Sequence, residues 1–302
     1  MSHSPRAFGI DPRALQRQFD RRAARFAEHD FLFREVQQRM IERLDAIRIE
    51  PACVLDIGCG PGRALTGWQT RFSHARIVGI DLSHAMLRIA RDRHAPSWVN
   101  RIGTLIGKKT LGAEWVQAGF DALPIKTAAA DVVLSNLALH YAHEPHRVLP
   151  EWARVLRTDG LLMFSCFGPD TLRELRELWP APGVLEFVDM HDYGDMLIEA
   201  GFTAPVMDME HLTLTYESAE HALRELRAVT GNPRTDRQRH LLGPRALDHI
   251  HQRLNARRDA SGRIAFTLEL IYGHAWKAAP RQRAERLPDG SVAVRVPLPR
   301  LR

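Results

Sequence analysis

Residues 52–62 read Ala-Cys-Val-Leu-Asp-Ile-Gly-Cys-Gly-Pro-Gly, and this stretch decides the fold. The apolar run up to Ile57 lies between a proline and a glycine-rich segment, which predicts a short buried strand. Gly58, Gly60 and Gly62 then form a G-x-G-x-G pattern. Because glycine tolerates unusual φ angles and lets the backbone lie against a ligand, the stretch predicts a strand that ends in a ligand-binding turn.

Two acidic residues accompany these glycines. Asp56 stands near the end of the predicted strand, where its carboxylate can accept hydrogen bonds from a ligand hydroxyl or ammonium group. Asp81 ends a second strand-like run, Arg-Ile-Val-Gly-Ile-Asp, and lies 25 positions further on. That separation suits a strand–helix–strand unit in which the second carboxylate reaches ribose hydroxyls. The glycines alone would fit a tight turn without a ligand equally well, but the two acids favour a nucleoside site.

The motif V-L-D-I-G-C-G-P-G, followed by G-I-D-L-S-x-x-M-L, resembles the cofactor-binding signature of class I S-adenosylmethionine-dependent methyltransferases. Proteins that bind nicotinamide dinucleotides usually carry G-x-G-x-x-G and lack an acid before the glycines, which argues against that class. The resemblance implies a Rossmann-like α/β fold with a seven-stranded, mostly parallel sheet, and S-adenosylmethionine as the cofactor. The cofactor-binding residues that it implies are Asp56, Gly58, Gly60, Gly62, Asp81, Leu82, Met86, Asp121, Asn136 and Leu137.

The composition is that of a soluble globular protein. The chain has 302 residues, of which 45% are hydrophobic and 26% charged, and no apolar run approaches the length of a membrane span. The first residues lack an apolar signal region, so we expect a cytoplasmic protein without a membrane partner. The three cysteines have no metal-type spacing and fit reduced, buried packing residues; no metal site is expected.

The net charge of +6 is spread along the chain. Basic residues gather at 13–25, 108–109, 234–245 and from 281 onward. Such a surface can attract acidic partners over long range, although solvated surface is the simpler interpretation of each cluster. Neither a nucleic-acid-binding motif nor a platform of interleaved aromatic residues is present, so we expect no nucleic-acid partner.

The apolar patterns divide the chain into four regions. Residues 1–50 predict a pair of helices, either a lid over the cofactor or packing on the sheet edge. Residues 51–167 predict the cofactor-binding core, with an irregular insertion at 95–114. Residues 168–280 predict helical insertions on the substrate side together with the last strands of the sheet, and 281–302 form a basic tail, either a hairpin or loose. The further strands are expected at 115–118, 131–135, 161–167, 205–216 and 263–277, and further helices at 146–157, 218–229 and 243–256.

Polar residues follow the strand that begins at Asp131. The carboxyl ends of parallel strands face the ligand crevice, so His140 and Tyr141 are placed to line the site and contact substrate. His140 could act as a general base, but a histidine that only lines the site is favoured. Class I methyltransferases commonly carry an acid where this chain has Gly119; either Asp121 contacts the adenine amino group instead, or backbone and water do.

Segments from about residue 15 to 278 resemble the BioC family, the malonyl-acyl-carrier-protein O-methyltransferases of biotin synthesis. The matching stretches are F-D-R-R-A-A-R-F-A-E-H-D, S-N-L-A-L-H-Y, F-G-P-D-T-L-R-E-L-R, L-R-E-L-R-A-V-T-G-N and F-T-L-E-L-I-Y-G-H-A-W-K. This resemblance implies a malonyl thioester on acyl carrier protein as substrate and partner. It also makes Arg224 the candidate for substrate-carboxylate binding, with a surface arginine as the equally weighted alternative. Phe26 departs from the family, which often has tyrosine there.

Two other functions compete with this one. The chain could methylate another small molecule or thioester, or it could be a non-methylating assembly factor or hydroxylase, because a related group with arginine-hydroxylating members shares the F-G-x-D-T-L segment. Positioning supplies most of the catalysis of methyl transfer, and a malonyl carboxylate is already ionised at neutral pH. No catalytic residue is therefore assigned.

Overall fold

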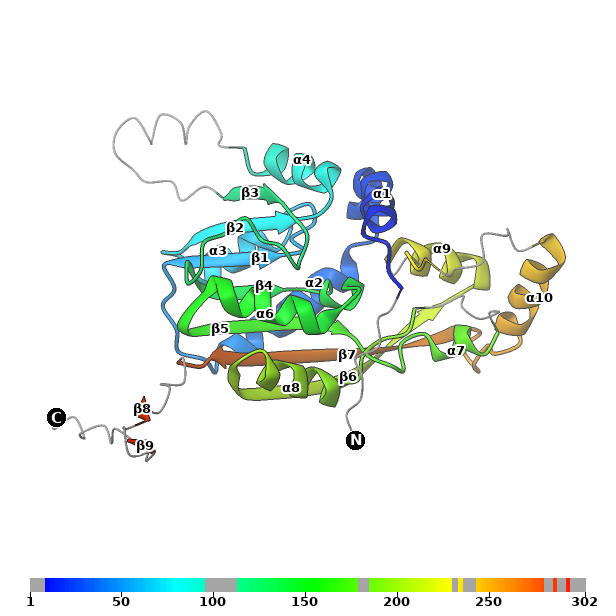
Figure 1. The fold of residues 1–302 in the computed structure, drawn as a ribbon. Helices are drawn as coiled ribbons and strands as arrows, with labels where there is room; N and C mark the ends of the chain where they lie inside the picture. Colours follow the sequence, from blue (N-terminus) through cyan, green and yellow to red (C-terminus); the bar gives the residue numbers. More distant parts are fainter. Residues whose placement is uncertain are drawn as a thin grey trace.

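The computed structural model describes residues 9–95, 113–178, 185–229, 233–235, 243–279, 285–286 and 292–293. Its centre is a seven-stranded sheet with the order β3-β2-β1-β4-β5-β7-β6 (Figure 1). Neighbouring strands from β3 to β5 are parallel, whereas β7 runs antiparallel to both β5 and β6. This confirms the predicted sheet. The strands are β1 Cys53–Ile57, β2 Arg76–Asp81, β3 Glu114–Gln117, β4 Ala130–Ser135, β5 Leu156–Phe167, β6 Phe202–Tyr216 and β7 Ile264–Lys277.

Helices flank every part of this sheet. The N-terminal ones are α1 Pro12–Arg22, the 3-10 helix η1 Ala23–Glu28 and α2 Phe31–Leu44. The core adds α3 Leu65–Arg71, α4 His84–Arg93, η2 Leu139–Tyr141 and α6 Pro145–Val155. The C-terminal half adds α7 Arg173–Arg176, α8 Met190–Glu199, α9 Ala219–Val229 and α10 Pro244–Asn255. None of the described helices is long and apolar enough to cross a membrane.

Two predicted segments lie largely outside the described residues. The insertion predicted at 95–114 is described only at its two ends. Of the basic tail, β8 Glu285–Arg286 and β9 Val292–Ala293 pair in antiparallel fashion, which favours the hairpin over the loose alternative.

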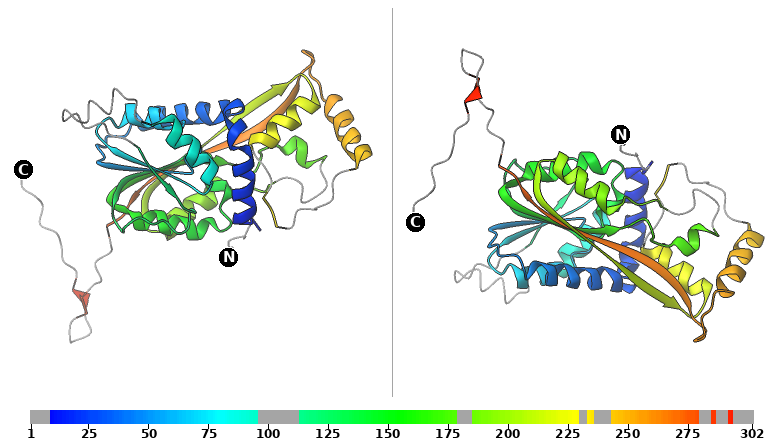
Figure 2. Two further views of the ribbon diagram at one scale, coloured as in Figure 1. Left: turned by 90° about the horizontal axis from the view of Figure 1, so that it is seen from above. Right: turned by 90° about the horizontal axis from the view of Figure 1, so that it is seen from below.

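Alternating strand residues build two apolar cores, one on each face of the sheet. Val54 and Val132 point into the core that α2 and α3 complete. Leu55 and Val133, one residue later in each strand, point into the core of α6 and α8. Figure 2 shows α2 on one face and α6 with α8 on the other. The continuous apolar runs of these strands follow from this burial on both faces.

The long β6–β7 pair extends beyond the rest of the sheet. Pairing of β5 with β7 stops at Phe167 and Leu270, whereas β6 and β7 remain paired to Tyr216 and Ile264. We call residues 211–216 and 264–269 the outer hairpin. It carries α9, and α1 lies between the core and this extension in both views of Figure 2. The carboxyl edge of the parallel strands thus faces α1, which separates the core from the β6–β7 extension.

Asp131, at the start of β4, ties three parts of the core together. Its side chain is 6% exposed, and its Oδ2 accepts hydrogen bonds from the backbone N–H groups of Ala52 and Cys53 at 2.6 and 2.8 Å. Its Oδ1 pairs with Arg157 Nε at 2.8 Å. The carboxylate therefore fixes the entry of β1 beside β4.

We predict that Asp131→Ala lowers the free energy of unfolding by about 2–4 kcal/mol, because it leaves two partly buried N–H donors without an acceptor. Urea denaturation measures this change. The exposed Asp248→Ala on α10 is the control and should stay within about 0.5 kcal/mol of the wild type. Equal stability of the two variants would contradict the role given to Asp131.

Candidate functional site

A cavity of about 910 Å³, partly open to solvent, lies at the carboxyl ends of β1, β2 and β4. Nine of the site residues predicted from the sequence line its wall: Asp56, Gly58, Gly60, Asp81, Leu82, Met86, Asn136, Leu137 and Tyr141. Four others lie off the wall: Gly62, Asp121, His140 and Arg224.

The glycine turn after β1 has the backbone that its sequence predicts. Gly58, Gly60 and Gly62 have φ angles of +79°, +53° and +69°. A Cβ on Gly58 would lie 2.4 Å from Ala138 Cβ, and one on Gly62 would lie 2.5 Å from the Trp115 ring. A Cβ on Gly60 would meet nothing within 4 Å. Packing therefore requires two of the glycines, and the third opens the backbone to the cavity.

Asp81, at the end of β2, holds this turn in place. Its Oδ2 accepts a hydrogen bond from Gly60 N–H at 2.8 Å, and its Oδ1 accepts one from Ser83 N–H at 2.7 Å. Ser83 in turn caps α4 by accepting from Met86 N–H. Burial raises the pKa of Asp81 to about 6, and the two backbone hydrogen bonds oppose that rise. One carboxylate thus joins the glycine turn to the start of α4.

Asp56 is the second acid of the site, and it is buried, with 3% of its surface exposed. Burial raises its pKa to about 7; the nearby Trp68 indole opposes the rise and the Asp81 carboxylate adds to it. In the described part of the chain, no lysine or arginine pairs with either acid. A buried carboxylate without a cation is costly, so a cationic ligand in this cavity would lower both pKa values and be held by them.

The N-terminal helices cover the cavity, and hydrogen bonds tie them to the core. Asp20 Oδ1 accepts from Ser83 Oγ at 2.6 Å and from Ala85 N–H at the start of α4. Asn136 Nδ2 donates to the Phe33 carbonyl at 2.8 Å, and Gln37 Nε2 donates to the carbonyl of Ala64 at 2.7 Å. The segment therefore lines the cavity and, through α2, also packs on the sheet.

Phe26 also lies on the cavity wall, where its ring packs against Phe33 at a centroid distance of 4.9 Å. It supplies apolar cover, and it cannot donate the hydrogen bond of a tyrosine hydroxyl.

Three charged residues of the wall, Asp30, Arg34 and Arg63, were not predicted from the sequence. Asp30, 3% exposed, forms ion pairs with Arg63 and, at 3.3 Å, with Arg34. Two guanidinium groups around one carboxylate leave a positive excess at this end of the cavity, opposite in sign to the end at Asp56. In the sequence Asp30 precedes a predicted helix and resembles an ordinary cap, and only the fold brings it to Arg63.

The acid of the third-strand turn lies beside the cavity. Ala118 and Phe120 line the wall, and Asp121 is exposed. A Cβ on Gly119 would lie 3.2 Å from Asp121 Oδ1. The carboxylate of Asp121 therefore stands next to the space that a side chain at position 119 would enter.

Tyr141 and His140 lie at different depths. Tyr141 is on the wall, and His140 packs behind it with a centroid distance of 4.3 Å between the rings. Burial lowers the pKa of His140 to about 3 and raises that of Tyr141. The imidazole is therefore neutral and a weak base at physiological pH, which agrees with a lining or contact role rather than general base catalysis.

Arg224 lies on the exposed face of α9, whose opposite face buries Leu223 and Leu226. The cavity wall does not include it. Its assignment to the substrate carboxylate stays a prediction.

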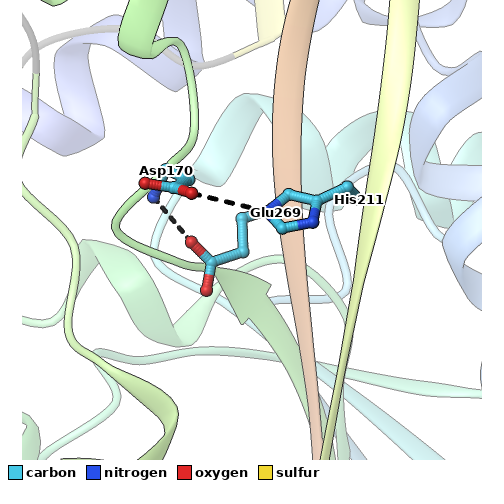
Figure 3. A group of neighbouring side chains, drawn as sticks. All are labelled: Asp170, His211 and Glu269. Carbon is cyan, nitrogen blue, oxygen red and sulfur yellow. Dashed lines mark hydrogen bonds and ion pairs between the residues drawn. The ribbon is translucent and has the colours of Figure 1, made fainter.

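Asp170, His211 and Glu269 lie close together at the base of the outer hairpin (Figure 3), with ligand-type atoms within 4.8 Å of one another. Their own contacts explain the cluster. Glu269 Oε2 accepts from Asp170 N–H at 2.6 Å, and His211 Nε2 lies 3.6 Å from Asp170 Oδ2. The cluster joins the turn after β5 to the β6–β7 pair, away from the cavity.

Comparison with known proteins places this geometry in a family. Residues 55–164 match a methyltransferase domain. The chain is 41% identical over 289 residues to the malonyl-[acyl-carrier protein] O-methyltransferase of Laribacter hongkongensis, covering 94% of this chain and 95% of the relative. The namesake from Methylovorus is 40% identical, covering 94% of each chain. A Bacillus halodurans protein solved as a candidate methyltransferase shares the fold, with a TM-score of 0.55, 18% identity, and coverage of 79% of this chain and 97% of its own.

We predict that Asp56→Asn stabilises the ligand-free protein above neutral pH. An acid whose folded-state pKa is raised contributes stability at low pH that is lost as pH rises through that pKa, here between about 4 and 7. The variant removes this loss, so its advantage over the wild type should grow between pH 5 and 8 by on the order of 3 kcal/mol.

Urea denaturation of both proteins across this pH range measures the difference in unfolding free energy. His140 has a lowered pKa, so it reduces the unfolding free energy as pH falls below about 6.5. This effect is the same in both proteins and cancels in their difference. A difference that does not change with pH would show that Asp56 is not a buried, unbalanced acid.

Proposed function

The chain belongs to the malonyl-[acyl-carrier protein] O-methyltransferase family, and we propose that it converts the free carboxylate of a malonyl group on acyl carrier protein to its methyl ester. S-adenosylmethionine is the methyl donor of this class. The product fits biotin synthesis, the process in which the BioC family acts, and we propose the cytoplasm as its location.

The observation that carries this proposal is the pair of unbalanced carboxylates in a glycine-lined cavity. S-adenosylmethionine has a sulfonium, an ammonium and a carboxylate, with a net charge of +1. The charged residues of the wall are the acids Asp30, Asp56 and Asp81 and the bases Arg34 and Arg63. With all of them ionised their sum is −1, so the wall complements the cofactor in total charge.

Asp81 and Asp56 differ in the ligand groups that they can still bind. Each Asp81 oxygen takes one backbone N–H and keeps a lone pair for a ribose hydroxyl. Asp56 has no lysine or arginine partner in the described chain, so it can hold the ammonium end. The arginines around Asp30 supply the positive potential for the cofactor carboxylate. Leu82 and Met86 form the apolar wall expected at the adenine.

The chemistry at the substrate needs little beyond alignment. When bound, the cofactor supplies an electrophilic methyl group to a carboxylate oxygen and leaves as a neutral thioether. A malonyl carboxylate is ionised at neutral pH, so no proton has to be removed. The weakly basic His140 is consistent with this. The wall's contribution is to hold donor and acceptor in line and to exclude water.

A carrier protein fits the charge of this chain. Acyl carrier proteins are acidic, and the net charge of +6 favours their approach. Arg224 is exposed on α9, on the extension side of α1, and we propose that it takes part in recognition of the loaded carrier.

The function is tested by incubating the protein with labelled S-adenosylmethionine and malonyl-loaded carrier protein. We predict a methyl ester on the malonyl group, and a fall of at least tenfold in cofactor affinity for Asp56→Asn at pH 8, because a charged interaction becomes a neutral one. Calorimetry measures the affinity, and Asp248→Asn on α10 is the control. Methyl transfer only to other acceptors would exclude the proposed substrate.

We predict that Asp121 recognises the adenine amino group in place of an acid at position 119. Calorimetry with S-adenosylhomocysteine and S-inosylhomocysteine, which has a carbonyl in place of the amino group, isolates this contact. The wild type should prefer the adenine form, and Asp121→Ala should lose roughly three- to tenfold of that preference. A preference that Asp121→Ala retains would assign the amino group to backbone or water.

A further inference from the structure

Arg22, the last residue of α1, is a half-buried cation that has no acidic partner among the described residues. Its guanidinium interacts electrostatically with Tyr141. Its Nη1 atom is buried and has no hydrogen-bond partner among the described residues. The other arginines of this segment are more exposed, Arg25 among them. An incompletely satisfied guanidinium in a protein interior needs an explanation.

The position of Arg22 relates it to the cavity. Leu15, Phe19 and Arg22 follow one another at helical spacing on one face of α1, and the first two line the cavity. The Phe19 ring meets the Tyr141 ring edge-on at 5.3 Å. Arg22 is close enough to Tyr141 to oppose the rise in that residue's pKa. It therefore stands beside the wall, on the helix that separates the core from the extension (Figure 2).

His140 presents a second unsatisfied donor next to Tyr141. It is 6% exposed, and its Nδ1 lies 3.5 Å from Phe167 N–H, which assigns the proton of the neutral ring to Nε2. In the described structure Nε2 is buried without a partner. Arg22 and His140 each interact with Tyr141, and each has a buried donor atom that lacks a described acceptor. An anionic acceptor is the one that also balances the charge of Arg22.

We propose that Arg22 binds the free carboxylate of the malonyl substrate and that His140 Nε2–H is a second donor to it. This assignment rests on the proposed function, since it names the residues that would distinguish a malonyl from an acetyl group. The planar guanidinium matches a carboxylate in bidentate geometry, and partial burial makes the pair stronger than one formed in water. Arg224 is open to solvent, where water competes for the same contact.

The test compares binding of malonyl-loaded and acetyl-loaded carrier protein in the presence of S-adenosylhomocysteine. We expect the wild type to prefer the malonyl form, and Arg22→Met and Arg22→Gln to lose roughly 10- to 100-fold of that preference. Arg22→Lys should retain part of it, and His140→Phe should lose roughly two- to tenfold. Arg25→Met removes an exposed charge one turn later and should leave the ratio unchanged. Affinity for S-adenosylhomocysteine should be unaltered in all of them.

The outcomes separate this inference from the proposed function. A malonyl preference that persists in Arg22→Met, or in Arg22→Gln if the methionine variant does not fold, overturns the role of Arg22 even when the wild type forms the methyl ester. A wild type that forms no methyl ester but prefers the malonyl form through Arg22 refutes the proposed reaction and supports the carboxylate site. An unchanged ratio in His140→Phe removes only the second donor.

Discussion

The site depends on two carboxylates at the ends of adjacent strands, of which Asp56 is buried and Asp81 is half-buried. Removing such charges from water is costly. Asp81 meets part of that cost by binding the backbone of the glycine turn and of the following helix. Asp56 is not compensated by a described basic residue, and its raised pKa records the cost. A fold optimised for stability alone would place an apolar residue or a partner there. A cationic ligand would balance the buried charge of Asp56. The residue therefore lowers the stability of the ligand-free protein and favours binding of the ligand.

The cover over the cavity depends on the same edge of the sheet. Asp20 binds the start of α4, the helix that Asp81 also anchors, and Asn136 binds the backbone of α2 from the loop after β4. Leu137, the next residue, has a φ of +49° and donates its N–H to Ser165. A non-glycine residue in this conformation is held there by its surroundings. Hydrogen bonds therefore join α1 and α2 to the turns that they cover.

The sequence predicted the parts of the site that depend on local backbone. The three positive φ angles follow from glycine conformational freedom, and the strands that end in the two acids follow from apolar periodicity. The seven-stranded sheet was implied by the family resemblance. The ion pair of Asp30 with Arg63 could not be predicted, because it joins residues 33 positions apart through tertiary packing. The unbalanced charge of Arg22 was equally hidden. In the sequence it is one of several arginines, and only burial distinguishes it from Arg25.

The cofactor side and the proposed substrate side of the chain differ in the sign of the charges that they bury. The cofactor side relies on acids at strand ends, which any protein of this fold can supply from a short motif. The proposed substrate side relies on α1, on the loop that holds Tyr141 and on the outer hairpin beyond them, segments that the matched methyltransferase domain at 55–164 does not fully contain. A cation beside the wall adds a positive charge that can attract the carboxylate of the substrate toward the cavity. Tyr141, a buried residue of this wall, lies next to Arg22. Specificity for an acidic acyl group would then arise from one helix packed on a common core.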